Sequence, residues 1–286
     1  MLSGSGFGAQ MREALIVHAN PSVRAMAMLE LAGLSPDDAA VKDARAAAAA
    51  AWPVQKILEA QYPAGYWMHP GLGISPHYRA TVWQVLFLAQ LGAPPSRPVQ
   101  RAVEAVHRSN CDTTGALRLR RGVTGRSAAL TGAVLWAVAR LGLADEARWR
   151  STWRWVEGSI GVDDVRPDAV TWLARAAAAW PRPDLVAELT THLRTDWDEM
   201  ARMPLTFPLA YQPDGLAHLQ AWAEVGQAHR IPGACLEALA ARRLPSGDWP
   251  QERLLRPLWF DPGAIGDPNP WITVRVLSLF LQADAA

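Results

Sequence analysis

Residues 81–92 read TVWQVLFLAQLG, and this stretch decides the fold class of the chain. Apolar side chains recur at i, i+3, i+4 and i+7, a hydroxyl residue opens the stretch and a glycine closes it, which is the pattern of an amphipathic helix with start and stop signals. Close copies stand at 22–33 (SVRAMAMLELAG) and 131–142 (TGAVLWAVARLG), and weaker ones at 169–180, 215–226 and 273–284. Six copies predict a helical array, because one such unit cannot bury its own apolar face.

The segments between these repeats have the composition of partner helices. Ser35-Pro36-Asp37-Asp38 combines a hydroxyl N-cap, a proline and two acids, and it opens an alanine-rich stretch at 39–51. Further candidates lie at 98–109, 145–157, 183–194 and 232–243. No stretch alternates apolar and polar residues as a strand does, so the sequence predicts an all-α chain. We expect one domain over 1–286 with six helical hairpins and inner helices near 21–33, 78–91, 127–141, 168–180, 213–226 and 270–283.

Composition excludes several classes of protein. The formal net charge is +1, which argues against nucleic acid as the main partner. No apolar run approaches the length of a bilayer span, and the first residues lack the pattern of an export signal. Cys111 and Cys235 form no metal-ligand pattern and no disulfide framework, so we expect two buried thiols in a cytoplasmic protein. No metal and no cofactor is predicted, and the sequence leaves the oligomeric state open.

The turns that lead into two of the repeats share a spacing. Gln61 precedes Gly65 by four residues and Trp67 by six, and Arg243 stands in the same relation to Gly247 and Trp249. A Gln or Arg at this place can bind exposed backbone of the next helix end, the glycine supplies a positive φ, and the tryptophan covers the junction. Residues 106–117 keep the glycine, with Cys111 and Leu117 in place of the Gln and the Trp.

This pattern, Gln-x3-Gly-x-Trp followed by the helical repeat, resembles the QW repeats of squalene-hopene and oxidosqualene cyclases and of protein prenyltransferase β-subunits. The resemblance covers nearly the whole chain. It is closest to stand-alone bacterial squalene-cyclase-like proteins at 203–216 (MPLTFPLAYQPDGL), 246–252 (SGDWPQE) and 269–277 (NPWITVRVL). It implies an α6/α6 toroid whose inner helices surround a cavity for an apolar isoprenoid or polycyclic small molecule.

The acid motif of the resembled cyclases, Asp-x-Asp-Asp, is incomplete in this chain. The segment GVDD at 161–164 lacks the first Asp, and the register of the repeat places only Asp168 at a motif position. The favoured interpretation is that Asp163, Asp164 and Asp168 cap the helix that begins near Ala169. The zinc set of the prenyltransferases requires an Asp two residues before a Cys, and neither cysteine has that context.

Two residues on the fifth repeat form a possible catalytic pair. Asp214 and His218 are four residues apart, so they share a helix face and could act as acid and orienting base beside Tyr211. Asp168 is the second candidate acid. The alternative is that Asp214 complements the helix dipole next to a satisfied core histidine.

Aromatic residues near the starts of the inner helices are candidates for the cavity wall, because aromatic faces stabilise a carbocation without quenching it. Tryptophan at helical spacing is also a common core residue, and Trp155 is expected to pack on an outer helix. The candidate ligand-binding residues are His77, Tyr78, Trp83, Arg126, Trp172, Trp222 and Trp271.

A basic loop leads into the third repeat. Residues 113–144 contain no Asp or Glu, whereas Arg118, Arg120 and Arg121 precede Arg126 in the loop LRLRRGVTGRS. Arginines before a helix N-terminus suit a diphosphate or carboxylate group, so the first three are candidate anion-binding residues. A solvated basic loop is the alternative.

Taken with the resemblance, these residues favour a terpene-cyclase-like enzyme that cyclises or isomerises its substrate by general acid catalysis. The alternative is a non-catalytic toroid scaffold that binds an apolar ligand or a protein partner. Glycan processing requires two positioned carboxylates, and acids are scarce on the expected inner faces.

Overall fold

The computed structural model describes residues 6–160 and 166–285, and all regular structure in these two ranges is helical. The described residues form fourteen α-helices and two short 3-10 helices, at Val123–Gly125 and Ala228–Arg230, with isolated β-bridges but no strand. The predicted all-α class is confirmed. No helix within these ranges is long and apolar enough to cross a membrane.

Each of the six sequence repeats forms a helix, and we call this set the repeat helices. They are α2 (Pro21–Glu30), α5 (Thr81–Gln90), α7 (Ala128–Arg140), α9 (Pro167–Ala179), α12 (Gly215–Glu224) and α14 (Pro270–Ala285). The predicted partner segments form α3 (Ala39–Ala49), α6 (Arg97–Asn110), α8 (Glu146–Glu157), α10 (Pro183–Thr190) and α13 (Gly233–Ala240). Three further helices were not predicted: α1 (Gly6–Ile16), α4 (Val54–Glu59) and α11 (Trp197–Arg202).

Side-chain caps explain where several of the helices start. Ser127 accepts a hydrogen bond from the backbone N–H of Leu130 at the start of α7, and Asp145 caps α8 in the same way. The predicted start of α3 at Ser35 is wrong: Asp38 is the N-cap, and its carboxylate accepts from Ala40 N at 2.8 Å. The Ser35 hydroxyl instead accepts from Asp37 N at 3.2 Å, in a local turn that precedes the helix.

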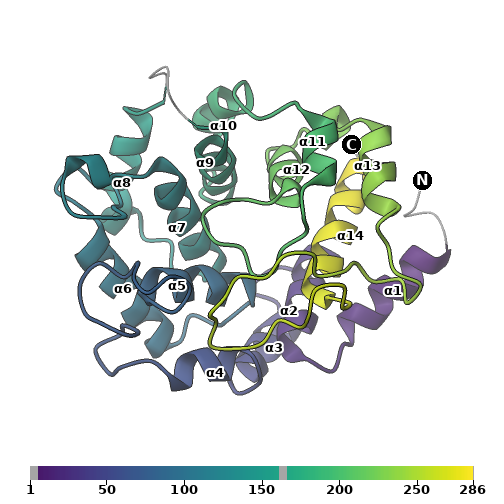
Figure 1. Cartoon of the computed structure of the whole chain (residues 1–286), viewed down its shortest axis with the longest axis horizontal. Helices are drawn as coiled ribbons and strands as arrows, with labels where there is room; N and C mark the ends of the chain where they lie inside the picture. Colours follow the sequence, from purple (N-terminus) through teal and green to yellow (C-terminus); the bar gives the residue numbers. More distant parts are fainter. Residues whose placement is uncertain (1–5, 161–165, 286) are drawn as a thin grey trace.

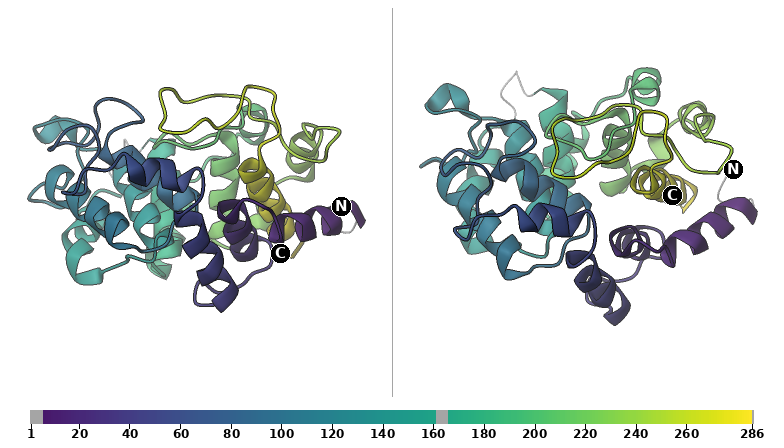
Figure 2. Two further views of the ribbon diagram at one scale, coloured as in Figure 1. Left: turned by 90° about the horizontal axis from the view of Figure 1, so that it is seen from below. Right: turned by 60° about the horizontal axis from the view of Figure 1, so that its bottom comes forward.

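The repeat helices pack against one another in chain order. α7 contacts α5 and α9, α9 contacts α12, α12 contacts α14, and α14 contacts α2. Between α2 and the end of α5, the hydroxyl of Ser22 donates to Leu91 O at 2.6 Å. In Figure 1 the chain colours run once around the molecule, with the partner helices further out and both termini on one side. Figure 2 shows α1 lying beside the C-terminal helix, and α1 and α14 are in contact.

The predicted turn geometry is present before three repeats. Gly65, Gly115 and Gly247 have φ values of 90°, 99° and 97°. The amide of Gln61 donates to Pro98 O at 2.9 Å, at the start of the next partner helix, and the indole of Trp67 donates to Ile57 O at 2.7 Å. The hydroxyls of Thr81, Thr131 and Thr273 each accept a hydrogen bond from the backbone N–H at the end of the turn before them. A positive-φ glycine and a threonine hydroxyl that accepts from the turn therefore recur at three of the junctions between helices.

The segment 203–212, which we call the central segment, lies among the repeat helices, in the middle of the molecule in Figure 1. Its residues 205–210 are all buried, although they form no helix. The backbone of Leu209 makes two hydrogen bonds with the side chain of Gln90, from N to Oε1 at 2.6 Å and from Nε2 to O at 2.8 Å. Phe207 stacks on Trp271 at 4.9 Å, with an angle of 2° between the ring planes.

This central segment changes where a ligand can bind. A cavity of about 30 Å³ remains among the six repeat helices, beside Phe207 and Leu209, and a cavity of that size has room for about two water molecules. The sequence predicted a ligand cavity at this place. The structure differs because a buried loop, held by side chains of distant helices, occupies the space.

Candidate functional site

A cavity of about 600 Å³ opens where α7 and α9 begin, so it lies at the N-terminal ends of two repeat helices. Its walls come from the loop before α7, the end of α8, the first turns of α7 and α9, and the last residues of the central segment. The lining residues are Leu119, Arg126, Ser127, Ala128, Ala129, Trp155, Gly158, Ser159, Arg166, Asp168, Ala169, Tyr211 and Gln212. We call it the mouth cavity.

Asp168 and His218 form a titratable pair at this cavity. Asp168 lies in the first turn of α9 with 42% of its side chain exposed, whereas His218 on α12 is buried. His218 Nε2 lies 3.8 Å from Asp168 Oδ1 and has no hydrogen-bond partner, while Nδ1 shares a hydrogen bond of 2.6 Å with the Thr171 hydroxyl. Asp168 and Thr171 are three residues apart on α9, so one helix face presents both groups to the histidine.

Burial shifts both of these groups toward their neutral forms. Loss of solvent raises the pKa of Asp168, and the nearby charges of Arg194 and Arg166 offset only part of this effect. Loss of solvent also lowers the pKa of His218 to about 4, and the charge of Arg194 acts in the same direction. His218 is therefore neutral near pH 7, and its contact with Asp168 is not an ion pair. The arrangement provides a carboxyl group whose protonated form persists to higher pH than that of a free aspartate.

Three of the aromatic side chains predicted to bind the ligand cluster around Tyr211, which lines the mouth cavity. Trp83 stacks on Tyr211 with ring centres 5.7 Å apart, and His77 and Tyr78 lie 5.7 and 5.5 Å from Trp83. The indole of Trp172 donates to Tyr211 O at 2.8 Å, which fixes the end of the central segment against α9. Burial raises the pKa of the Tyr211 phenol, so it stays protonated at neutral pH. The structure thus brings together the first three aromatic candidates with Tyr211.

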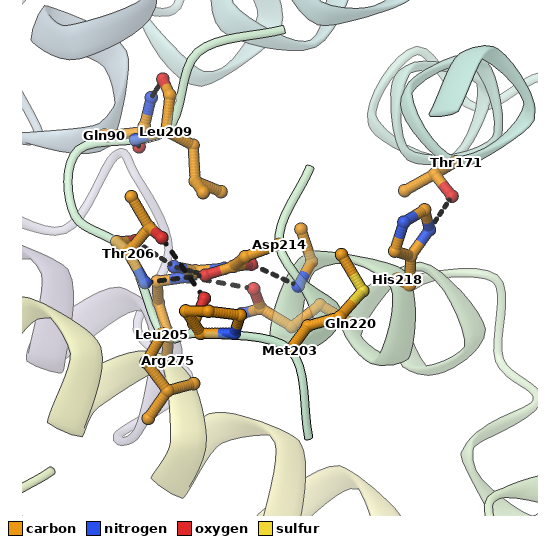
Figure 3. Close-up of polar contacts among 12 residues, drawn as sticks. Gln90, Thr171, Met203, Leu205, Thr206, Leu209, Asp214, His218, Gln220 and Arg275 are labelled. Atoms are coloured by element: carbon orange, nitrogen blue, oxygen red, sulfur yellow. Dashed lines mark hydrogen bonds and ion pairs between the residues drawn. The ribbon is translucent and has the colours of Figure 1, made fainter. Parts of the chain in front are cut away.

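Asp214 and His218 do not face each other, contrary to the prediction (Figure 3). Asp214 caps α12 by accepting from Ala217 N at 2.8 Å, and it forms an ion pair with Arg275 at 2.9 Å. Its side chain is 1% exposed, and that of Arg275 is 8% exposed. Burial raises the pKa of Asp214, but the charge and hydrogen bonds of Arg275 outweigh it and hold that pKa below its usual value. Asp214 is ionised and fully bonded, which are not the properties of a proton donor.

Of the arginines in the loop before α7, Arg126, a predicted ligand-binding residue, is the one that lines the mouth cavity. Its Nε donates to Asp112 Oδ2 at 2.7 Å. Burial raises the pKa of Asp112, but hydrogen bonds from Thr114 and Arg126 outweigh it and bring that pKa to about 2. Arg120 and Arg121 are exposed and Arg118 is half-buried, and none of the three lines the cavity.

Two other predicted residues lie away from the mouth cavity. The indole of Trp222 donates to Arg194 O at 2.8 Å, and its aromatic ring packs on Trp197 of α11. Trp271 packs on the central segment, and its indole donates to Ser22 Oγ at 3.1 Å.

Sequence reasoning missed several residues of the site. Trp155 packs against the core from the partner helix α8, as expected, and its place on the cavity wall was not predicted. Arg166 and Gln212 line it too: Arg166 lies two residues before the predicted Asp168, and Gln212 immediately follows the predicted Tyr211. Thr171 could have been predicted, since it stands three residues after Asp168 and therefore lies on the same helix face. The predicted acids Asp163 and Asp164 lie outside the described residues.

No protein-family model matches the chain, and no curated protein matches it in sequence. Within the described ranges, no group of three or more His, Cys, Asp or Glu side chains is placed to hold a metal ion. Cys235 is buried and Cys111 is half-buried, and both are free thiols.

Proposed function

We propose that this protein is an α/α toroid of six helical hairpins and acts as a terpene-cyclase-like enzyme on an apolar, isoprenoid-like or polycyclic molecule bound in the mouth cavity. The resemblance of its turns and repeats to QW repeats supports the family. The chain-order packing of the repeat helices agrees with a toroid. The central segment moves the proposed ligand site from the middle of the ring to the mouth.

The observation that carries this proposal is the environment of Asp168. A half-buried carboxyl group with a raised pKa faces a cavity of about 600 Å³, beside a buried neutral histidine. Protonation of an alkene or epoxide needs a carboxylic acid that is still protonated near the working pH. In this scheme the proton passes from Asp168 to the substrate, and the resulting cation later loses a proton to a base. The flanking charges of Arg166 and Arg194 stabilise the carboxylate that Asp168 becomes.

The walls of the cavity suit a molecule with one polar end. The phenol ring of Tyr211 and the indole of Trp155 offer aromatic faces, which attract a developing positive charge. Arg126 and Arg166 lie on the wall as well, and guanidinium groups bind phosphate or carboxylate oxygens. An isoprenoid with an anionic head group meets both requirements.

Asp168→Asn tests the enzyme proposal. The ligand is first identified by native mass spectrometry of the purified protein, and its turnover is then measured for the parent and the variant. Turnover should be lost while ligand affinity and the melting temperature stay near parent values, because asparagine keeps the shape but cannot donate a proton at neutral pH. Asp184→Asn is the matched control, since Asp184 also follows a proline in the first turn of a helix, α10, and is exposed. Full turnover by Asp168→Asn would remove Asp168 from the mechanism.

A non-catalytic scaffold is the second candidate, and the central segment favours it. The central segment fills the space among the repeat helices, so no enclosed cavity is left there in which a long substrate could fold. A scaffold predicts that a molecule binds the mouth cavity with unchanged affinity in Asp168→Asn, and that no product forms from it in the parent. If the parent forms a product from the bound molecule, the scaffold proposal is wrong and the enzyme proposal is supported.

A further inference from the structure

The cavity of about 30 Å³ among the six repeat helices, which we call the inner cavity, has a charged wall. Three arginines and two glutamates line it: Arg140, Arg175, Arg275, Glu30 and Glu224. Glu30, Arg140 and Glu224 are the last residues of α2, α7 and α12, so this cavity lies toward the C-terminal ends of the repeat helices. It shares no lining residue with the mouth cavity, which lies at the N-terminal ends of α7 and α9.

Arginines outnumber acids in this buried cluster. Three ion pairs account for six of its charges, namely Arg140 with Glu30, Arg175 with Glu224, and Arg275 with Asp214. A fourth arginine, Arg45 of α3, is 6% exposed and lies within ion-pair distance of no acid in the described residues. Its guanidinium donates to the carbonyls of Gly92, Ala93 and Arg140, at 3.2, 2.6 and 3.2 Å. These carbonyls satisfy its hydrogen bonds but carry no net charge, so the cluster has one positive charge that no acid neutralises.

Two buried side chains of the wall have a donor that is not used. Arg175 is 3% exposed, and its Nε and Nη2 donate to Glu224 at 2.9 and 2.8 Å. Its Nη1 is buried and has no hydrogen-bond partner among the described residues. Gln220 is 7% exposed and uses its Oε1 to accept from Arg275 Nε at 3.0 Å, whereas its amide nitrogen donates to no described residue. Because a buried donor without an acceptor is costly, this wall calls for an acceptor.

The side-chain oxygens of the wall are already bonded. Both oxygens of Glu224 accept from Arg175, as described above. One oxygen of Glu30 pairs with an arginine and the other accepts from the Ser278 hydroxyl at 3.3 Å. The oxygen of Gln90 accepts from the central segment at 2.6 Å. A water molecule has two hydrogens of its own to place, whereas a halide ion only accepts hydrogen bonds. The unused donors and the excess charge therefore favour an anion.

We propose that the inner cavity binds one small monovalent anion of the size of chloride, held by Arg175 Nη1 and the amide nitrogen of Gln220. A cavity of about 30 Å³ is too small for a phosphate, a sulfate or an organic acid. The guanidinium of Arg175 is fixed for this task, because it lies over the rings of Trp136 and Trp172 at 4.6 and 5.0 Å. The ion joins α9 to α12 and offsets the uncompensated charge, so its binding stabilises the fold.

Thermal melting of the full chain tests this proposal. Sodium chloride replaces sodium gluconate at constant ionic strength, so that charge screening is the same in every sample and only the size of the anion differs. The melting temperature should rise by about 2–4 °C for each tenfold increase in chloride above the dissociation constant. Equal melting temperatures in the two salts overturn the proposal.

Gln220→Glu assigns the chloride effect to the inner cavity. Glutamate keeps an oxygen that accepts from Arg275, but it replaces the amide donor by a second, negatively charged oxygen. It therefore supplies the negative charge that the cluster lacks, and it repels an anion. The variant should melt at the same temperature in chloride and in gluconate. Gln100→Glu is the matched control, since Gln100 is exposed on α6 and the change in charge is identical, and it should keep the chloride dependence of the parent.

Bromide gives a second readout that needs no variant, should Gln220→Glu lose its helical circular dichroism. Crystals of the parent soaked in sodium bromide should show an anomalous peak in the inner cavity, within hydrogen-bond distance of Arg175 Nη1. A crystal without a peak there overturns the proposal, and so does a folded Gln220→Glu variant that keeps the full chloride dependence. None of these measurements involves turnover, so they can fail while the Asp168 test succeeds, and the reverse.

Discussion

Replacing Asp214 by Asn should destabilise the fold strongly, because this carboxylate holds a buried cluster together (Figure 3). It accepts hydrogen bonds from Thr206 N at 3.0 Å and Ala217 N at 2.8 Å, and it pairs with Arg275 at 2.9 Å. Asparagine keeps one oxygen for the cap but replaces the other by an amide group that faces donors. The guanidinium of Arg275, 8% exposed, is left without a counter-charge.

The expected loss follows from the burial of this pair. Removing one partner of a buried ion pair costs about 3–5 kcal/mol, because an uncompensated charge stays behind. Domains of this kind have a total free energy of unfolding of roughly 5–15 kcal/mol, so the variant should be close to its stability limit. The loss should also appear in the parent at acid pH. Since the pKa of Asp214 lies below its unfolded value, its contribution is present above about pH 4 and is lost as the pH falls further.

Urea denaturation followed by tryptophan fluorescence and circular dichroism measures this loss. Asp198→Asn is the control, since Asp198 pairs with Arg202 on the surface with side chains 81% and 77% exposed. That pair should contribute less than about 1 kcal/mol. If Asp214→Asn unfolds within about 1 kcal/mol of the parent, the structural role that we assign to Asp214 is refuted, and the residue becomes available again as an acid.

Three further results are expected. The pKa of His218 is lowered to about 4 in the folded state, so its neutral form contributes stability above about pH 6.5, and this stability is lost as the pH drops toward 4. The free energy of unfolding, measured as a function of pH, should fall by roughly 3 kcal/mol over that range. His218→Gln should remove this pH dependence. Gly115→Ala should cost about 1–3 kcal/mol more than Gly71→Ala in denaturation experiments, since φ is near 100° at both but a Cβ at Gly115 would lie 2.3 Å from the backbone of Ser151; equal costs would contradict the close approach. Phe207→Ala should cost about 3–5 kcal/mol by the same assay, and a small loss would mean that the central segment is not packed.

The sequence predicted the helices well because their signals are local. The apolar spacing of residues 81–92 and the cap at Asp145 involve neighbours in the chain, and such patterns survive in the folded protein. The central segment has no such signal. Its backbone is satisfied by Gln90, Gln251 and Arg275, which stand 44 to 119 residues away, and no spacing in the sequence indicates these contacts.

The candidate pair on α12 shows where spacing misleads. Positions four residues apart share a helix face, but Asp214 is the N-cap, so its carboxylate folds back over the first turn instead of projecting with His218. α12 is also buried on all sides from Gly215 to Ala223, and each face meets a different neighbour. The histidine therefore meets Thr171 and Asp168, of which Asp168 had been placed by the register of the resembled motif.

Ligand binding at the mouth cavity is the central claim, and calorimetry with farnesyl diphosphate tests it most directly. The parent should bind this probe. Ala129→Trp should weaken binding with little change in melting temperature, because Ala129 is only half-buried and lines the cavity, and an indole there takes up part of the space. Ala129→Ser, which leaves the cavity open, should bind as the parent does. Equal affinity in the parent and Ala129→Trp, or no heat of binding in any of the three, would contradict the account.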